Sequence, residues 1–204
     1  GYRINGKTTY ALEGSIFIAG AGVQWLRDKI KFIKKASDTE KIIKSLKSNS
    51  GIYLVPAFTG LGAPYWAVNA RGVLSGLTRD TGPKEIVRAT VESVAYQTHD
   101  LFEAMKNDGL RPKIIKVDGG MVKNNWFSQF LADVVDVKVL RPKVEETTAL
   151  GAAFMAGLQI GVYKSLRDIS NNWQVDRTFQ PKMKSSNRKS LLKGWDKAIK
   201  KTLS

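Results

Sequence analysis

Strands and helices alternate between residues 113 and 161, and this order constrains the fold more than any other feature of the chain. An apolar run at 113–117 predicts a strand, a glycine pair follows it, and a helix is predicted at 124–135. A second strand is predicted at 137–141 and a second helix at 146–161. Strands that alternate with helices in this way pair in parallel, and the helices cover the sheet. The segment therefore predicts an α/β layer.

The second of these helices is rich in small residues. They recur along its length as Ala149, Ala152, Ala153, Ala156 and Gly157. Because the distance between packed elements depends on the side chains at their contact, small residues allow a close approach. We therefore expect this helix to pack closely against a neighbouring element.

The rest of the chain adds elements of both kinds. Apolar periodicity and cap residues predict helices at 20–33, 37–48, 83–106 and 186–202. Apolar and β-branched runs predict extended segments at 7–19, 51–58 and 72–77, and a loop is expected at 170–185. Hairpin-like strands near the start, together with parallel pairing near residue 113, predict a mixed sheet in one domain over residues 1–204.

Composition restricts the classes of function open to this chain. Cysteine is absent and His99 is the one histidine, so disulfides, thiolate chemistry and histidine-based metal clusters are excluded within it. The chain has no apolar run of about 18 residues, the length that a transmembrane helix requires. The net charge of +15 comes with lysines spread along the chain and no aromatic-plus-arginine motif. We therefore expect no nucleic-acid partner.

Two glycine-marked helix starts are the candidate binding elements. Gly119 and Gly120 follow a predicted strand, and Asn124 stands at the start of the next helix. Gly20 opens another helix, with Gln24 one turn later. Glycine lets a ligand approach the backbone, helix N-terminal amides favour anions, and an asparagine amide offers a donor and an acceptor to a purine edge.

Spacing alone leaves two interpretations of these glycines open. They form either a nucleotide cradle or tight connections that only pack a helix against a strand. The pattern is neither a P-loop nor a complete G-x-G-x-x-G motif, and spacing does not show that the two helix starts meet.

Longer motifs carry a resemblance to a known family. The chain resembles the C-terminal half of the FGGY carbohydrate kinases, and most closely those members that phosphorylate glycerol. The matching stretches are "YALEGSIFIAGAGVQWLRD", "VPAFTGLGAPYW", "ARGVLSGLTR", "VESVAYQTHDLFEAM", "VDGGMVKNN" and "ETTALGAAFMAGLQIGVY". Glycerol is the implied acceptor because the first, second and last of these look more like the glycerol-phosphorylating members than like the pentose kinases.

The resemblance implies a fold and a nucleotide site. The family has two actin-like, ribonuclease H-like domains with ATP in the cleft between them, and this chain corresponds to the second domain. Gly20 and Gln24 match positions that line the nucleotide site, and Gly120 and Asn124 match the glycine and asparagine beside the adenosine. The two helix starts are thus implied to flank one ATP, used with Mg²⁺ in the full-length enzyme.

The resemblance also implies what this chain lacks. In the family, the polyol-binding residues, the aspartate base and the hairpin that opens the second domain all precede the positions matched here. We therefore expect no catalytic and no metal-binding residue in this chain, and no kinase activity from it alone. A cytoplasmic location and assembly of the full-length protein as a dimer or tetramer are implied as well. Two alternatives stay open: a kinase of another polyol or sugar, and a non-catalytic ATP-binding fragment from a split gene.

Overall fold

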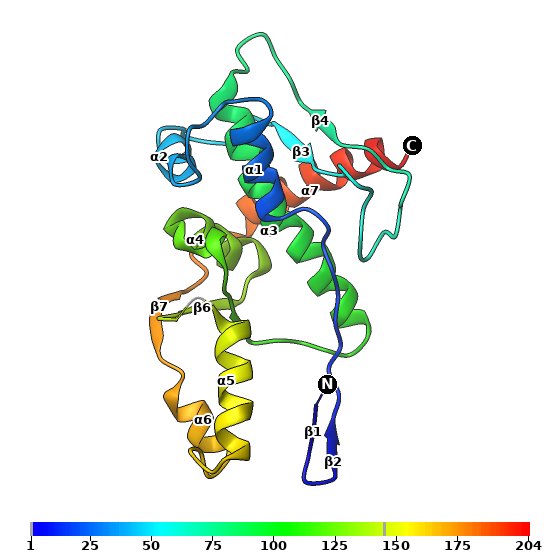
Figure 1. Ribbon diagram of the computed structural model, residues 1–204. Coiled ribbons are helices and arrows are strands. Elements are labelled where there is room, and N and C mark those ends of the chain that lie inside the picture. Colours follow the sequence, from blue (N-terminus) through cyan, green and yellow to red (C-terminus); the bar gives the residue numbers. More distant parts are fainter. Residues whose placement is uncertain (1, 145) are drawn as a thin grey trace.

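The computed structural model describes residues 2–144 and 146–204 (Figure 1). Its helices are α1 (Gly20–Asp28), α2 (Asp38–Lys44), α3 (Pro83–Asn107), the 3₁₀ turn η1 (Gly120–Lys123), α4 (Asn125–Val135), α5 (Thr147–Gln159), α6 (Leu166–Asn172) and α7 (Ser185–Leu203). Its strands are β1 (Tyr2–Ile4), β2 (Lys7–Thr9), β3 (Tyr53–Val55), β4 (Val73–Ser75), β5 (Ile114–Lys116), β6 (Lys138–Pro142) and β7 (Val175–Phe179).

The strand-helix alternation produces a mixed sheet in the order β5-β6-β7. β5 and β6 pair in parallel, with Ile115 opposite Val139, and β6 pairs antiparallel with β7. The predicted α/β layer and mixed sheet are therefore confirmed. Two further antiparallel pairs, β1 with β2 and β3 with β4, form separate two-stranded sheets.

The loop predicted at 170–185 is wrong. α6 ends at Asn172 within that range, and β7 follows it. Four of the five residues of β7 are exposed and only Phe179 is buried, so the strand has no apolar alternation from which it could be predicted. Its pairing with β6 decides its conformation instead.

Helix α3 is the centre of the packing, and α1, α2, α4 and β3 contact it (Figure 1). Its first turn is capped by the Glu85 carboxylate, which accepts a hydrogen bond from the Gly82 N–H at 3.0 Å. Apolar residues at helical spacing turn one face to the core. Buried residues of this face include Val87, Val91, Val94 and Ala95. The helix predicted at 83–106 is confirmed.

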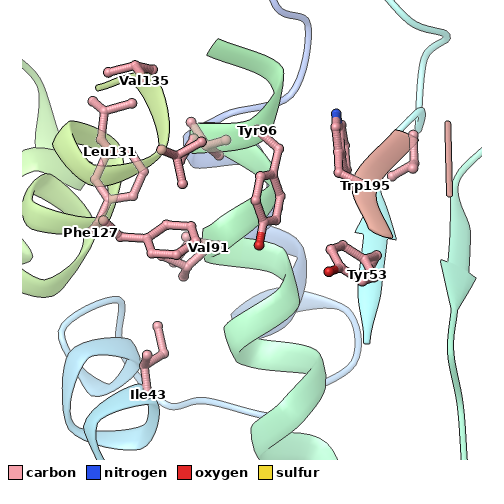
Figure 2. Close-up of a cluster of buried hydrophobic side chains, with 14 of the residues drawn as sticks. Ile43, Tyr53, Val91, Tyr96, Phe127, Leu131, Val135 and Trp195 are labelled. Carbon is pink, nitrogen blue, oxygen red and sulfur yellow. The ribbon is translucent and has the colours of Figure 1, made fainter. Parts of the chain in front are cut away.

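Aromatic rings join α3 to α4, α7 and β3. Figure 2 shows Tyr96 projecting from α3 between side chains of α4 and the rings of Trp195 and Tyr53. Its ring stacks on Trp195 at 5.3 Å between centroids and meets Phe130 edge-on at 5.6 Å. Offset and edge-on ring pairs add about 0.5–1.5 kcal/mol each beyond the burial of their area. The C-terminal helix α7 therefore contributes to the core through Trp195 and Ile199.

The first predicted helix is shorter than expected. The range 20–33 forms a helix only as far as Asp28, because Lys31 adopts a left-handed backbone with φ of +58°. Ile33 still lies in the core at 5% exposure, after the turn instead of on the helix. Ile33 therefore fits the apolar spacing of a helix, although the backbone between Asp28 and Ile33 is not helical.

The extended segment predicted at 7–19 forms a strand only at β2. Beyond β2 the backbone bonds to other parts of the chain and not to a neighbouring strand. The Ser15 carbonyl accepts from the Ala63 N–H at 3.0 Å, and the Ile18 carbonyl accepts from the Gln97 side chain at 3.2 Å. These contacts hold the segment across α3 towards the start of α1.

The close packing expected of α5 is not observed. α5 and α6 lie at one end of the molecule, away from α1 and α2 (Figure 1). The exposed small residues of α5 are Ala149, Ala152, Ala153 and Ala156. Gly157 is buried, against the ring of Tyr163. Apolar as α5 is, no helix in the described part of the chain is both long and apolar enough to span a membrane.

Candidate functional site

One cavity of about 980 Å³ contains all four predicted binding residues: Gly20, Gln24, Gly120 and Asn124. Its walls come from α1, α2, α3 and the turn between β5 and α4. Its volume is near the upper end for small-molecule sites in proteins, which span about 300–1,000 Å³. The two glycine-marked helix starts, which spacing could not join, therefore meet at one site.

The turn after β5 exposes its two glycines to open space. Gly119 has φ of +85°, a conformation that only glycine adopts without strain. Gly120 is not among the residues with positive φ, and a Cβ built on it would meet no atom within 4 Å. Neither backbone strain nor a protein neighbour therefore requires glycine at position 120. A ligand that approaches the backbone from the cavity would require it.

The same test separates the two glycines of α1. A Cβ at Gly22 would lie 3.0 Å from the Thr90 methyl group, so Gly22 permits close packing of α1 on α3. A Cβ at Gly20 would have only Met121 nearby, with its Cγ at 4.0 Å. Gly22 therefore serves helix packing, whereas Gly20 faces the cavity.

Asn124 is held at both ends of its side-chain amide. As the N-cap of α4, it accepts from the Phe127 N–H through Oδ1 at 2.9 Å. Its Nδ2 donates to the hydroxyl of Thr39 on α2 at 3.2 Å. Gln24 stands on α1 as an exposed side chain at the cavity wall. Thr39 is a cavity residue that the sequence did not indicate.

Glu40 is the second residue of the site that the sequence did not indicate. Its Oε2 accepts from the Asn125 N–H, the first of α4, at 3.3 Å, and its Oε1 accepts from Lys44 at 2.6 Å. A carboxylate at a helix N-terminus satisfies the helix dipole from within the protein. Two N–H groups at the start of α4 are therefore already bonded within the protein, to Glu40 and to Asn124.

The described residues place no group of three or more His, Cys, Asp or Glu side chains where they could hold a metal ion. On the cavity wall, the Asp118 carboxylate accepts a hydrogen bond from the Thr147 hydroxyl at the start of α5. Mg²⁺ in nucleotide sites takes one or two carboxylates together with phosphate oxygens and waters. The described acidic residues therefore form no preformed cage for the metal.

A sequence profile of the FGGY family of carbohydrate kinases, C-terminal domain, matches residues 2–160. The chain belongs to this family. Glycerol kinase of Ectopseudomonas mendocina is 57% identical to it over 205 residues, which cover 100% of this chain and 41% of that protein. Glycerol kinase of Coxiella burnetii is 54% identical and is covered to 40% of its length. The chain thus spans about two fifths of these curated relatives.

Solved structures of FGGY kinases share the fold. The crystal structure of Plasmodium falciparum glycerol kinase with ADP superposes with a TM-score of 0.84 at 37% identity, over 93% of this chain and 38% of that one. Xylulose kinase of Lactobacillus acidophilus superposes with a TM-score of 0.77 over 92% of this chain and 38% of that one. At 23% identity, the second likeness supports the fold alone.

Proposed function

We propose that this chain is the C-terminal, ATP-binding part of a glycerol kinase, which transfers the γ-phosphoryl group of ATP to glycerol and yields sn-glycerol 3-phosphate. The observation that carries the proposal is the cavity, in which Gly20 and Gly120 present backbone without any protein neighbour that requires glycine. The similarity to glycerol kinases, one of them solved with ADP, supports the choice of nucleotide and substrate.

The chain's own residues have binding roles in this proposal. Gly20 and Gly120 allow the nucleotide to lie against the backbone of α1 and of the turn after β5. Asn124 and Gln24 supply polar contacts from α4 and α1. Residues 1–204 form one nucleotide-binding domain.

In this proposal, catalysis also needs a base and glycerol-binding residues that lie outside this chain. In the reaction, a glycerol oxygen attacks the γ-phosphorus, the bond from that phosphorus to the ADP oxygen breaks, and the glycerol hydroxyl loses its proton. Phosphoryl transfer depends on positioning and charge stabilisation on both sides of the γ-phosphate, and a bound Mg²⁺ would supply part of the positive charge. We assign the proton-accepting base and the glycerol contacts to the part of the kinase that this chain does not span. Cytoplasmic location and assembly as a dimer or tetramer belong to the same proposal and rest on family membership.

The experiment compares Gly120→Val with Gly151→Val by isothermal titration calorimetry with ADP. Both glycines have open space where a Cβ would stand, but Gly151 lies on α5 outside the cavity. We expect Gly120→Val to weaken ADP binding by about tenfold or more, a loss of about 1.4 kcal/mol. Gly151→Val should leave binding unchanged. Equal affinities in the two variants would contradict the proposed site.

A coupled ADP-release assay tests whether this chain binds the nucleotide without catalysing phosphoryl transfer. The chain alone, supplied with ATP, Mg²⁺ and glycerol, should show no glycerol-dependent turnover. Turnover would contradict the assignment of the base to another part of the kinase. The alternative of another polyol or sugar kinase has less support, because the relatives at 57% and 54% identity are named glycerol kinase, whereas the likeness to xylulose kinase is at 23%.

A further inference from the structure

Thr39 is a buried polar residue whose hydroxyl hydrogen is already used in a hydrogen bond. It is 3% exposed, and its Oγ1 donates to the Ala36 carbonyl at 2.7 Å within the turn that starts α2. A hydroxyl has one hydrogen to donate, so towards any other group Thr39 acts only as an acceptor. It accepts from the Asn124 amide nitrogen at 3.2 Å.

Because the Thr39 hydroxyl can only accept from Asn124, it fixes the orientation of the Asn124 amide. The N-cap bond to the Phe127 N–H requires oxygen on the α4 side, and Thr39 requires nitrogen on the α2 side. A flipped amide would lose both hydrogen bonds at once and would place nitrogen against an N–H and oxygen against a hydroxyl oxygen. The amide therefore keeps one N–H and one oxygen lone pair for other partners.

The spacing between α2 and α4 is fixed next to this contact. Glu40, the neighbour of Thr39, accepts from the Asn125 N–H at 3.3 Å, so two consecutive residues of α2 bind the N-cap and the first residue of α4. Lys44 holds the other oxygen of that carboxylate at 2.6 Å. Thr39 thus stays within reach of Asn124 because a second hydrogen bond ties the same two elements.

We infer that Thr39 is a positioning residue for nucleotide recognition: it orients the Asn124 amide so that this side chain presents one N–H and one oxygen lone pair to the nucleotide. The inference rests on the proposed function of the cavity, and it adds a residue from α2. Both residues line the cavity, and 85 positions separate them in the sequence. Thr39 itself needs no contact with the ligand to have this role.

The test is a double-mutant cycle read by ADP affinity. Thr39→Val should weaken ADP binding by about threefold to tenfold, the effect of one misplaced hydrogen bond, and Thr39→Ser should restore it. In an Asn124→Ala background, Thr39→Val should have no further effect. A general disturbance of α2 would weaken binding in both backgrounds, and that result would overturn the inference.

A control at the C-cap of α2 separates orientation of the Asn124 amide from stability of the helix. The Ser45 hydroxyl donates to the Ile42 carbonyl at 2.7 Å, and Ser45 lies outside the cavity. Ser45→Ala removes an exposed hydrogen bond from the C-terminal end of the same helix, so ADP affinity should stay within about twofold of the unmodified chain. A loss as large as that of Thr39→Val would overturn the inference.

NMR without ligand distinguishes failure of this inference from failure of the proposed function. The side-chain amide signals of Asn124 should be well resolved in the unmodified chain, and Thr39→Val, but not Thr39→Ser, should shift them. If these signals respond and ADP does not bind, the orienting contact is supported and the nucleotide site is wrong. If ADP binds and the signals do not respond to Thr39→Val, the orienting role is wrong and the site stands.

Discussion

Asp100 joins three separate parts of the chain through one carboxylate oxygen. Its Oδ2 accepts from the Tyr65 hydroxyl at 2.8 Å and from the Trp195 Nε1–H at 2.6 Å. Asp100 lies on α3, Trp195 on α7, and Tyr65 in the loop between β3 and β4. Replacing Asp100 with alanine would therefore leave two donors without an acceptor.

The expected loss follows from the burial of those two donors. An unsatisfied buried donor costs about 1–3 kcal/mol. Trp195 is 2% exposed and would bear the full penalty, whereas Tyr65 is only half-buried and water can partly replace the carboxylate. We expect Asp100→Ala to lower the free energy of unfolding by about 3 kcal/mol. For a chain of this size, that corresponds to a fall in Tm of about 6–12 °C.

Urea unfolding and calorimetry of matched variants would measure this loss. Asp100→Asn keeps a carbonyl oxygen that can accept both bonds, so it should lose clearly less than Asp100→Ala. Trp195→Phe removes one donor, so the double variant with Asp100→Ala should lose about 1–2 kcal/mol less than the sum of the single losses. Strict additivity, or a loss below about 0.5 kcal/mol for Asp100→Ala, would show that Asp100 does not stabilise the fold through these two donors.

Three further perturbations follow from the backbone and from buried phenols. Gly119→Ala should lower stability by about 1–3 kcal/mol because its φ of +85° is strained for any side chain, and it should weaken ADP binding in the same calorimetric titration. Gly194→Ala should lower the urea midpoint despite better helix propensity, because the new Cβ would stand 2.6 Å from Tyr53 Cε2. Burial raises the pKa of Tyr53, of Tyr65 and of Tyr96 above the usual value near 10. Their contribution to stability is therefore present below about pH 10 and is lost above it, by up to about 1.4 kcal/mol per pH unit for each tyrosine.

The controls for these predictions come from the same chain. Gly151→Ala in α5 meets no neighbour within 4 Å and should leave stability unchanged or raised. Gly194→Ala at or above the stability of the unmodified chain would show that the Tyr53 ring moves aside at no cost. Tyr96→Phe should reduce the fall of the unfolding free energy with pH above about pH 10 by the contribution of one ionising group. A free energy of unfolding that stays constant above about pH 10 would contradict the burial argument.

Elements with strong internal patterns could be predicted from the sequence, and those defined by distant contacts could not. The apolar periodicity of α3 and of α7 predicted the ends of both helices to within a residue or two. β7 has one buried residue and exists through its pairing with β6, so the chain around it resembles a loop. Lys31 breaks the first helix although the apolar spacing around it continues.

The candidate site shows the same division. Family motifs identified Gly20, Gln24, Gly120 and Asn124, and the fold brings them to one cavity. Thr39 stands in the first turn of a short helix, where a threonine is an unremarkable residue near a cap. Its importance comes from a partner 85 positions away, a contact that no local pattern contains.

The charges around the cavity also suggest how a nucleotide would lie in it. Glu40 holds a negative charge at the start of α4, and the Asn125 and Phe127 N–H groups there are already bonded. Phosphates are disfavoured at that end, whereas a neutral base or ribose can use Asn124. The first turn of α1 contains no acidic residue and no side-chain cap, and Arg27 lines the same wall. The base is therefore expected between α2 and α4 and the phosphates towards α1, where the remainder of the proposed kinase would have to meet them.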